Sequence, residues 1–193
     1  MTLISAILHH MPDLVLASPP AALLLAPGAG ANRDDATLVA LEHGLPEITV
    51  ERLTLATTSV ANAVKMVVAA AEELARQVGC NPGEIAFGGR SFGGRSCSVA
   101  VAEGLPAAAL VLLSYPLHPP AQPAKLRVDH FCDIAVPTLF VSGDKDPFGT
   151  PDEFVEHLAA VDGPTRLEWV AGNHSPKARI PEIIEVVRHF MGL

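Results

Sequence analysis

The sequence lacks an uninterrupted apolar run long enough to cross a membrane. Its longest apolar stretch, residues 14–31, is broken by Pro19-Pro20 and again by Pro27-Gly28, so it falls short of a span of about 20 residues. Residues 1–8 are apolar but lack the basic n-region of a secretory signal. We therefore expect a soluble protein without a membrane partner, located in the cytoplasm.

Cysteine and basic residues are both scarce. The three cysteines, Cys80, Cys97 and Cys132, are an odd number without metal-ligand spacing and too few for a disulfide scaffold, which favours a reducing compartment. The 13 basic residues are outnumbered by 21 acidic ones and form no run. A surface that binds duplex nucleic acid normally clusters Lys and Arg, so we expect no nucleic-acid partner.

Apolar runs and helical patterns alternate along the chain. Runs typical of buried strands occur at residues 22–26, 48–55, 84–88, 108–114, 138–142 and 166–170. Helical patterns occur at residues 34–43, 60–78, 91–103, 151–161 and 180–191. Because the strands are continuously apolar, the alternation predicts a three-layer α/β/α sandwich around a mostly parallel sheet. The length and the absence of repeats or linkers favour a single domain, residues 1–193.

One motif stands between a predicted strand and a predicted helix. Gly89-Arg90-Ser91-Phe92-Gly93 fits the pattern GxSxG, which places a serine on a sharp strand-to-helix turn with its hydroxyl exposed. The flanking glycines avoid collisions in so tight a turn. The near repeat at Ser96 lacks the closing glycine and would lie inside the helix. Ser91 is therefore a candidate nucleophile, and Ser96 is interpreted as structural.

A serine hydroxyl needs a base, and the base needs an acid that orients it. In such a sheet the partners follow in the order nucleophile, acid, histidine. Asp144 and Asp146 follow one strand, and His174 follows the next. Because right-handed crossovers bring these loops to one edge of the sheet, we expect a Ser91, His174 and carboxylate triad. Asp146 is preferred because it stands further into its loop, and Asp144 remains the alternative.

The loop after the first strand is rich in small residues. A tetrahedral intermediate needs backbone N–H donors, and one would come from Phe92 at the start of a helix. A second could come from Ala29 or Gly30, although a plain turn would also account for this loop. A nucleotide-binding interpretation is weaker, because neither GxGxxG nor GxxxxGK[ST] is completed.

Four segments together resemble a known fold. They are residues 88–95, 114–120, 143–149 and 172–175. The chain resembles the α/β-hydrolase fold and, more narrowly, a dienelactone-hydrolase-like family of small proteins with testis-expressed, chromatin-complex-associated and bacterial members. The resemblance implies Ser91, Asp146 and His174 as the triad and residues 28–30 as the oxyanion loop. This family often has histidine where the chain has Pro27, which affects only the shape of that loop.

The resemblance also draws attention to residues that could touch substrate. Tyr115, His118 and Phe148 are candidates for substrate binding, although each could instead belong to the core or a turn. Arg95 is expected to pair with a carboxylate or to pack against the strand-to-helix turn that carries Ser91 (the nucleophile elbow).

The functional prediction is a serine esterase without metal or cofactor. Larger relatives insert a lid at the position of residues 115–136, and this segment is too short to build a deep lipid tunnel. We therefore expect small or exposed acyl esters as substrates. The alternative is a catalytically silent interaction module with the same fold. A cysteine hydrolase is a weaker third, since no cysteine occupies the elbow.

Overall fold

The computed structural model describes residues 13–193, so the apolar residues 1–8 lie outside the described part. Within that part, six strands form one sheet in the order β2-β1-β3-β4-β5-β6, and every pairing is parallel. The strands are β1 (Ala22–Ala26), β2 (Thr49–Arg52), β3 (Ile85–Arg90), β4 (Ala109–Leu113), β5 (Thr138–Gly143) and β6 (Thr165–Val170). The predicted parallel sheet is confirmed.

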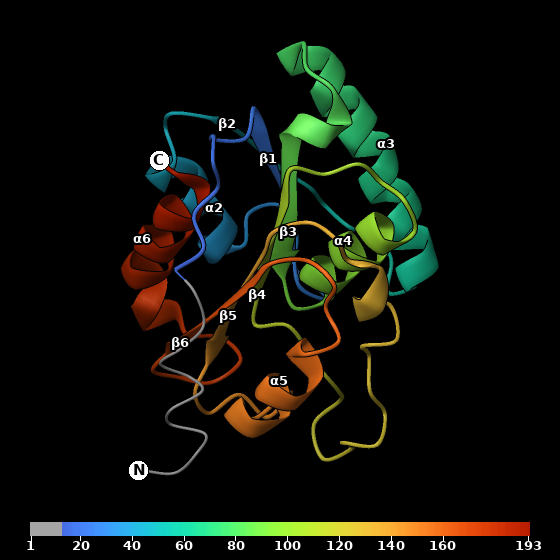
Figure 1. The fold of residues 1–193 in the computed structure, drawn as a ribbon, viewed down its shortest axis with the longest axis vertical. Helices are drawn as coiled ribbons and strands as arrows, with labels where there is room; N and C mark the ends of the chain where they lie inside the picture. Colours follow the sequence, from blue (N-terminus) through green and yellow to red (C-terminus); the bar gives the residue numbers. More distant parts are fainter. Residues whose placement is uncertain (1–12) are drawn as a thin grey trace.

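Helices cover both faces of the sheet (Figure 1). On one face lie α2 (Ala36–Gly44) and α6 (Ile180–Met191), and on the other lie α3 (Val60–Val78) and α4 (Phe92–Ala102). Helix α5 (Pro151–Leu158) follows β5, and its Phe154 packs with the α3 and α4 side of the core. Short 3₁₀ turns occupy Pro82–Glu84, Phe131–Asp133 and Lys177–Arg179. The three-layer architecture is therefore as predicted.

Alternate residues of each strand enter different halves of the core. Leu24 packs in the cluster under α3 and α4, whereas Leu23 and Leu25 pack in the cluster under α2 and α6. Side chains alternate between the two faces of a strand, so a sheet covered on both faces needs apolar residues at every position. This is why the strands are recognisable as continuous apolar runs.

Helix α2 begins later than predicted. The expected start at Asp34 moves to Ala36, because Asp35 has non-helical backbone angles and its carboxylate accepts a hydrogen bond from Thr37 N–H. An aspartate in that arrangement caps the helix instead of continuing it. The strand predicted at 48–55 is also shorter, spanning Thr49–Arg52.

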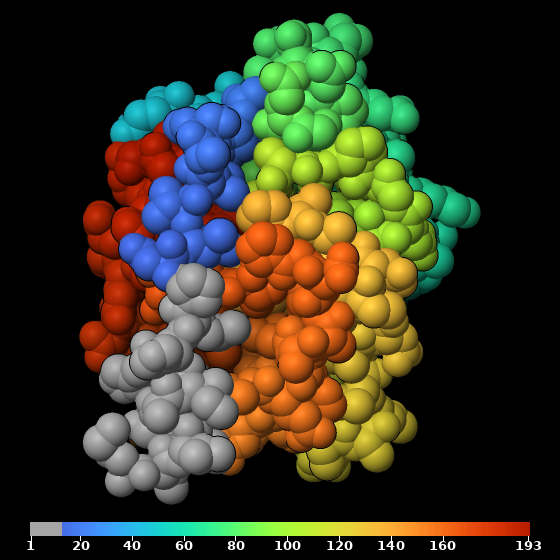
Figure 2. Space-filling model, viewed as in Figure 1, coloured from blue at the N-terminus to red at the C-terminus, as the bar shows by residue number. Residues whose placement is uncertain are grey.

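The connection between β4 and β5 forms no lid. It runs over the surface beside α5 (Figures 1 and 2), and His118 of this connection lies 3.3 Å from the Glu153 carboxylate of α5. Among the described residues, no helix has both the length and the apolar composition that a membrane crossing requires.

Candidate active site

Ser91 occupies a strained turn between β3 and α4. Its backbone has φ 50° and ψ −114°, in the left-handed half of backbone space, which a residue with a side chain adopts at a cost of about 1–3 kcal/mol. The Ser91 N–H donates to the carbonyl of Leu113 at 2.8 Å, which ties the turn to β4. The sequence motif therefore forms the sharp strand-to-helix turn that it predicts.

The glycines of the motif allow β1 to approach the turn. A Cβ at Gly89 would lie 2.0 Å from the Ala26 carbonyl oxygen, and one at Gly93 would lie 2.2 Å from the same atom. Real Cβ atoms do not come so near a carbonyl oxygen, so only glycine fits at these positions. The close approach brings the loop that follows β1 against Ser91.

His174 bridges Ser91 and Asp146. Its Nε2 lies 2.8 Å from Ser91 Oγ, and its Nδ1 lies 2.7 Å from Asp146 Oδ2. The Asp146 side chain is fully buried, whereas the imidazole is 18% exposed. The loops after β3, β5 and β6 thus bring together side chains that are 55 and 28 residues apart in the sequence.

The two aspartates after β5 have different partners. Asp146 uses its second oxygen, Oδ1, to accept from Phe148 N–H at 2.9 Å, which fixes the carboxylate plane. Asp144 is exposed and accepts from Gly172 N–H at 2.8 Å. Asp146 therefore contacts the imidazole, whereas Asp144 fastens the histidine loop to the end of β5.

Further contacts hold the histidine from two sides. Phe148 stacks on the imidazole with ring centroids 3.9 Å apart. Arg90 donates to the His174 carbonyl at 2.9 Å and to the Ser175 hydroxyl, and it lies 4.0 Å from Asp35. Arg90 was not predicted to have a role, because the position before the serine in GxSxG is unrestricted.

Backbone donors lie on both sides of Ser91. Phe92 begins α4, and its N–H has no protein acceptor among residues 13–193. Ala29 lines the same cleft as Ser91 and Phe92, and its N–H likewise has no acceptor in the described part of the chain. Gly30 is exposed and does not line the cleft. Of the two residues proposed for the second donor, Ala29 is the better placed.

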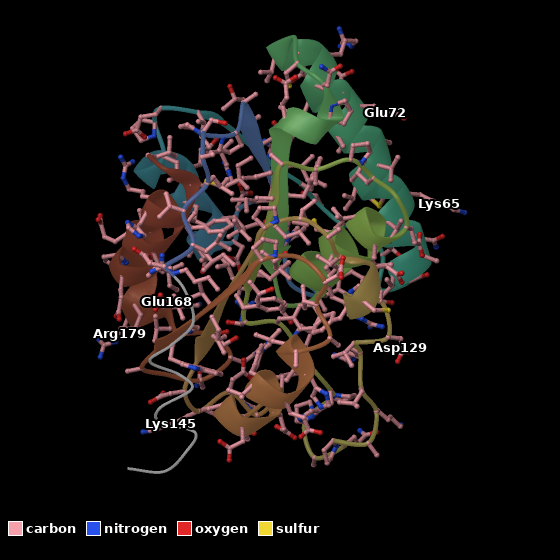
Figure 3. The ribbon with its side chains drawn as sticks, viewed as in Figure 1. Lys65, Glu72, Asp129, Lys145, Glu168 and Arg179 are labelled. Carbon is pink, nitrogen blue, oxygen red and sulfur yellow. The ribbon has the colours of Figure 1, made fainter. Side chains whose placement is uncertain are left out.

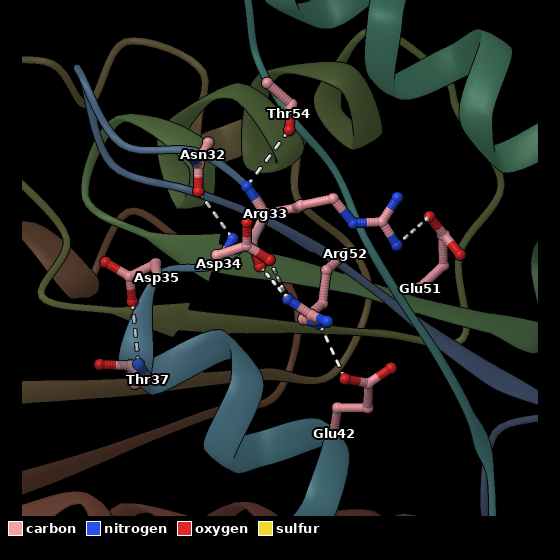
Figure 4. Close-up of polar contacts among 9 residues, drawn as sticks. All are labelled: Asn32, Arg33, Asp34, Asp35, Thr37, Glu42, Glu51, Arg52 and Thr54. Atoms are coloured by element: carbon pink, nitrogen blue, oxygen red, sulfur yellow. Dashed lines mark hydrogen bonds and ion pairs between the residues drawn. The ribbon is translucent and has the colours of Figure 1, made fainter.

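A polar network anchors the loop after β1 to β2 (Figure 4). The Arg52 guanidinium contacts Glu42 at 2.8 Å and Asp34 at 3.4 Å, and it also donates to the carbonyl of Arg33. The N–H of Arg33 donates to the Thr54 hydroxyl at 3.2 Å. These contacts tie residues 33 and 34, which follow Ala29 in the same loop, to β2 and α2.

A cleft of about 440 Å³ opens over Ser91 and His174. The residues around it are Ala29, Thr58, Val60, Arg90, Ser91, Phe92, Arg95, Pro116, Arg127, Phe148 and His174. Of the residues predicted to bind substrate, only Phe148 lines the cleft. Thr58, Val60 and Arg127 were not predicted, because nothing local in the sequence links the start of α3 or the β4–β5 connection to the elbow.

Two of the predicted substrate contacts lie elsewhere. Tyr115 is fully buried among Phe131 and Phe140, and its hydroxyl donates to the Arg127 carbonyl at 2.7 Å. His118 is also buried, with Nδ1 2.8 Å from the Pro119 carbonyl oxygen. Packing and hydrogen bonds within the β4–β5 connection turn both side chains away from the cleft.

Arg95 lines the cleft. Of the two roles expected for it, pairing with a carboxylate is not found within residues 13–193, which leaves packing at the turn that carries Ser91. No group of three or more His, Cys, Asp or Glu side chains in this part of the protein is arranged to hold a metal ion. The site thus combines the Ser91 hydroxyl, the His174 imidazole and the Asp146 carboxylate with arginine side chains that line the cleft.

The fold and the match to a family define the class of protein. The family described as an alpha/beta hydrolase domain matches residues 19–182, so the chain belongs to this family. Membership of this family supports a hydrolase.

Solved structures with the same fold include a dienelactone hydrolase and an esterase. Est1E from Butyrivibrio proteoclasticus is 19% identical, with a TM-score of 0.72 over 93% of this chain and 88% of that chain. The dienelactone hydrolase from Anabaena variabilis is 16% identical, with a TM-score of 0.73 over 93% and 88% of the two chains. An esterase from an Arctic intertidal metagenomic library is 13% identical, with a TM-score of 0.66 over 90% and 84%. At these identities the likeness concerns the fold alone.

Proposed function

We propose that this protein is a serine hydrolase that cleaves small or exposed acyl esters through an acyl-enzyme intermediate. The observation that carries the proposal is the continuous hydrogen-bonded chain from Ser91 Oγ through both nitrogens of His174 to Asp146. A hydroxyl is a weak nucleophile by itself, and this arrangement supplies the base and the orienting acid that it requires. The esterases of similar fold make an ester the first substrate class to test.

In the acylation step, Ser91 Oγ attacks the ester carbonyl carbon while His174 Nε2 accepts the hydroxyl proton. The carbonyl π electrons move to oxygen, and the N–H groups of Phe92 and Ala29 stabilise the resulting oxyanion. When the oxyanion collapses, the bond to the alkoxy group breaks and His174 donates its proton to the leaving alcohol. Asp146 stays ionised and stabilises the imidazolium.

In the deacylation step, a water molecule replaces the alcohol. His174 accepts a proton from water as its oxygen attacks the acyl carbon, and the same N–H groups stabilise the second oxyanion. Collapse breaks the bond to Ser91 Oγ, which takes the proton back from His174, and the carboxylic acid leaves. Water is the only co-reactant that this cycle consumes.

The decisive test is covalent labelling of the nucleophile. A fluorophosphonate probe is expected to label the wild type at Ser91, identified by peptide mapping, and not to label Ser91→Ala. The matched control is Ser18→Ala, because Ser18 is exposed and does not line the cleft. Equal labelling of wild type and Ser91→Ala would exclude Ser91. Absence of labelling in the wild type would favour the silent interaction module.

A further inference from the structure

The cleft has a charge opposite to that of the whole protein. The chain carries a formal net charge of −8, yet Arg90, Arg95 and Arg127 line the cleft and no Asp or Glu does. Figure 3 shows how other charged residues are placed: Lys65 and Glu72 lie on the outer side of α3. Positive charge gathered in a concave site attracts anions and raises their local concentration.

Arg90 already has protein partners. Its guanidinium donates to the His174 carbonyl and the Ser175 hydroxyl, and it lies near the Asp35 carboxylate. These contacts use Arg90 to position the histidine loop. Its guanidinium donors are therefore already engaged by the protein.

Arg95 and Arg127 lack such partners in the described part of the protein. The Nε of Arg95 is buried without a hydrogen-bond acceptor, although a buried donor left unpaired costs about 1–3 kcal/mol. Arg127 forms no ion pair among residues 13–193. Burial and the charge of Arg95 lower the pKa of Arg127, as expected for two close guanidinium groups with no anion between them.

The surroundings of the two arginines do not neutralise them. The Tyr115 hydroxyl donates to the Arg127 backbone carbonyl, and burial raises the pKa of this hydroxyl, so it carries no charge. The nearby His130 has its pKa lowered to about 4 by burial and by Arg95, so it is neutral at pH 7. Asp129 is exposed and lies at the edge of the molecule in Figure 3. The protein thus leaves two cationic side chains facing the cleft without a counter-charge.

We propose that Arg95 and Arg127 bind an anionic group of the substrate, a carboxylate or a phosphate, while Ser91 attacks an ester elsewhere in the same molecule. This inference rests on the proposed hydrolase function. Guanidinium groups bind both anions through paired N–H donors, and hydrogen bonds to charged groups are the strong ones.

The position of Arg95 limits the length of the substrate. Arg95 lies one helical turn after Ser91, and its backbone N–H donates to the Ser91 carbonyl at 3.0 Å. One turn of helix rises about 5.4 Å, so a chain of a few carbons can join the ester to the bound anion. We therefore expect short half-esters of dicarboxylic acids, or phosphorylated esters of similar length, to be better substrates than neutral esters.

The first experiment compares two esters with acyl chains of equal length. The mono-p-nitrophenyl ester of adipic acid carries a terminal carboxylate, and p-nitrophenyl hexanoate does not. We expect the wild type to have a kcat/KM for the adipate ester at least about tenfold higher, mainly through a lower KM, because a charge-assisted hydrogen bond is worth at least that factor. The preference should shrink in about 0.5 M NaCl through screening.

Variants connect the preference to the two arginines. Arg95→Gln and Arg127→Gln should each reduce the adipate-to-hexanoate ratio about tenfold, and Arg95→Lys should restore part of it by returning the charge. Arg76→Gln is the matched control, because Arg76 is exposed on α3 and paired with Glu73. Circular dichroism checks that each variant is folded, and the two independent positions keep the test valid if one fails to fold.

A binding measurement separates failure of this inference from failure of the hydrolase proposal. Titration calorimetry of the wild type with benzoate, phenyl phosphate and neutral benzyl alcohol needs no turnover. Tighter binding of benzoate or of phenyl phosphate identifies the preferred anion. If neither anion binds better than benzyl alcohol and the ester ratio is one or less, the inference is wrong. If anions bind but no ester is hydrolysed, the hydrolase proposal is wrong and the anion site remains.

Discussion

The loop after β5 carries two aspartates that should respond differently to replacement by asparagine. Asp146→Asn should almost abolish catalysis, whereas Asp144→Asn should hardly affect it. Asp146 offers Oδ2 to His174 at 2.7 Å and Oδ1 to Phe148 N–H at 2.9 Å. In Asp146→Asn, the amide oxygen keeps the Phe148 bond and the NH₂ group then faces His174 Nδ1. An NH₂ group cannot accept from Nδ1–H, so the imidazole adopts the tautomer with its proton on Nε2.

That tautomer cannot accept the Ser91 proton. The corresponding substitution in a well-studied serine protease lowers kcat about 10⁴-fold with the geometry intact, equivalent to about 5.5 kcal/mol of activation free energy. We expect a loss of the same order here. Asp144→Asn should change kcat less than about threefold, because its amide oxygen can still accept from Gly172 N–H, a neutral bond worth about 1 kcal/mol.

The assay is kcat for a short p-nitrophenyl ester, together with the second-order rate of fluorophosphonate labelling. Both variants should melt within a few degrees of the wild type, because asparagine and aspartate have nearly the same shape. If Asp144→Asn lost more activity than Asp146→Asn, the two aspartates would have to exchange roles. If Asp146→Asn retained more than about a tenth of the activity, the tautomer argument would be refuted.

Two predictions concern stability. Gly89→Ala should lower the free energy of unfolding in urea by about 3 kcal/mol or more, since its Cβ would lie 2.0 Å from a carbonyl oxygen. The control is Gly104→Ala, which is strained by its positive φ but has open space around it, so it should cost only about 1–2 kcal/mol. Equal costs for the two variants would contradict the packing argument. Burial depresses the folded-state pKa of His130 from 6.5 to about 4, so protons bind the unfolded state more readily between these values and stability falls as the pH drops through that window. Because the ring is partly exposed, we expect the free energy of unfolding to be about 1–2 kcal/mol lower at pH 4 than at pH 7. His130→Gln should show a smaller difference between the two pH values. An unchanged pH dependence in this variant would refute the assignment to His130.

Much of the fold could be predicted from the sequence because each element carries a local signal. Helix α3 and helix α6 have the predicted limits, and in both the C-terminal cap is a glycine with positive φ. The apolar strands follow from a sheet that is covered on both faces. The order of Ser91, Asp146 and His174 also lies in the sequence, since parallel strands bring successive loops to one edge.

The partners of individual side chains could not be predicted, because they depend on long-range packing. Tyr115 and Arg127 belong to the same connection, but the tyrosine enters the aromatic core and its hydroxyl fixes the arginine backbone. No periodicity in the sequence encodes this difference. The choice between Asp144 and Asp146 depends in the same way on which carboxylate the turn buries.

The proposed catalytic residues and the proposed anion-binding residue Arg127 lie on differently supported parts of the fold. Ser91 and His174 follow strands and are fixed by the sheet, whereas Arg127 lies on an irregular connection between β4 and β5. That connection is held by its own contacts, including the bond between Arg127 N–H and the Leu117 carbonyl at 2.8 Å. A change in this connection can alter the charge of the cleft without moving the hydrogen-bonded chain at Ser91. Substrate preference should therefore respond to substitutions in residues 115–136 that leave the rate of fluorophosphonate labelling unaffected.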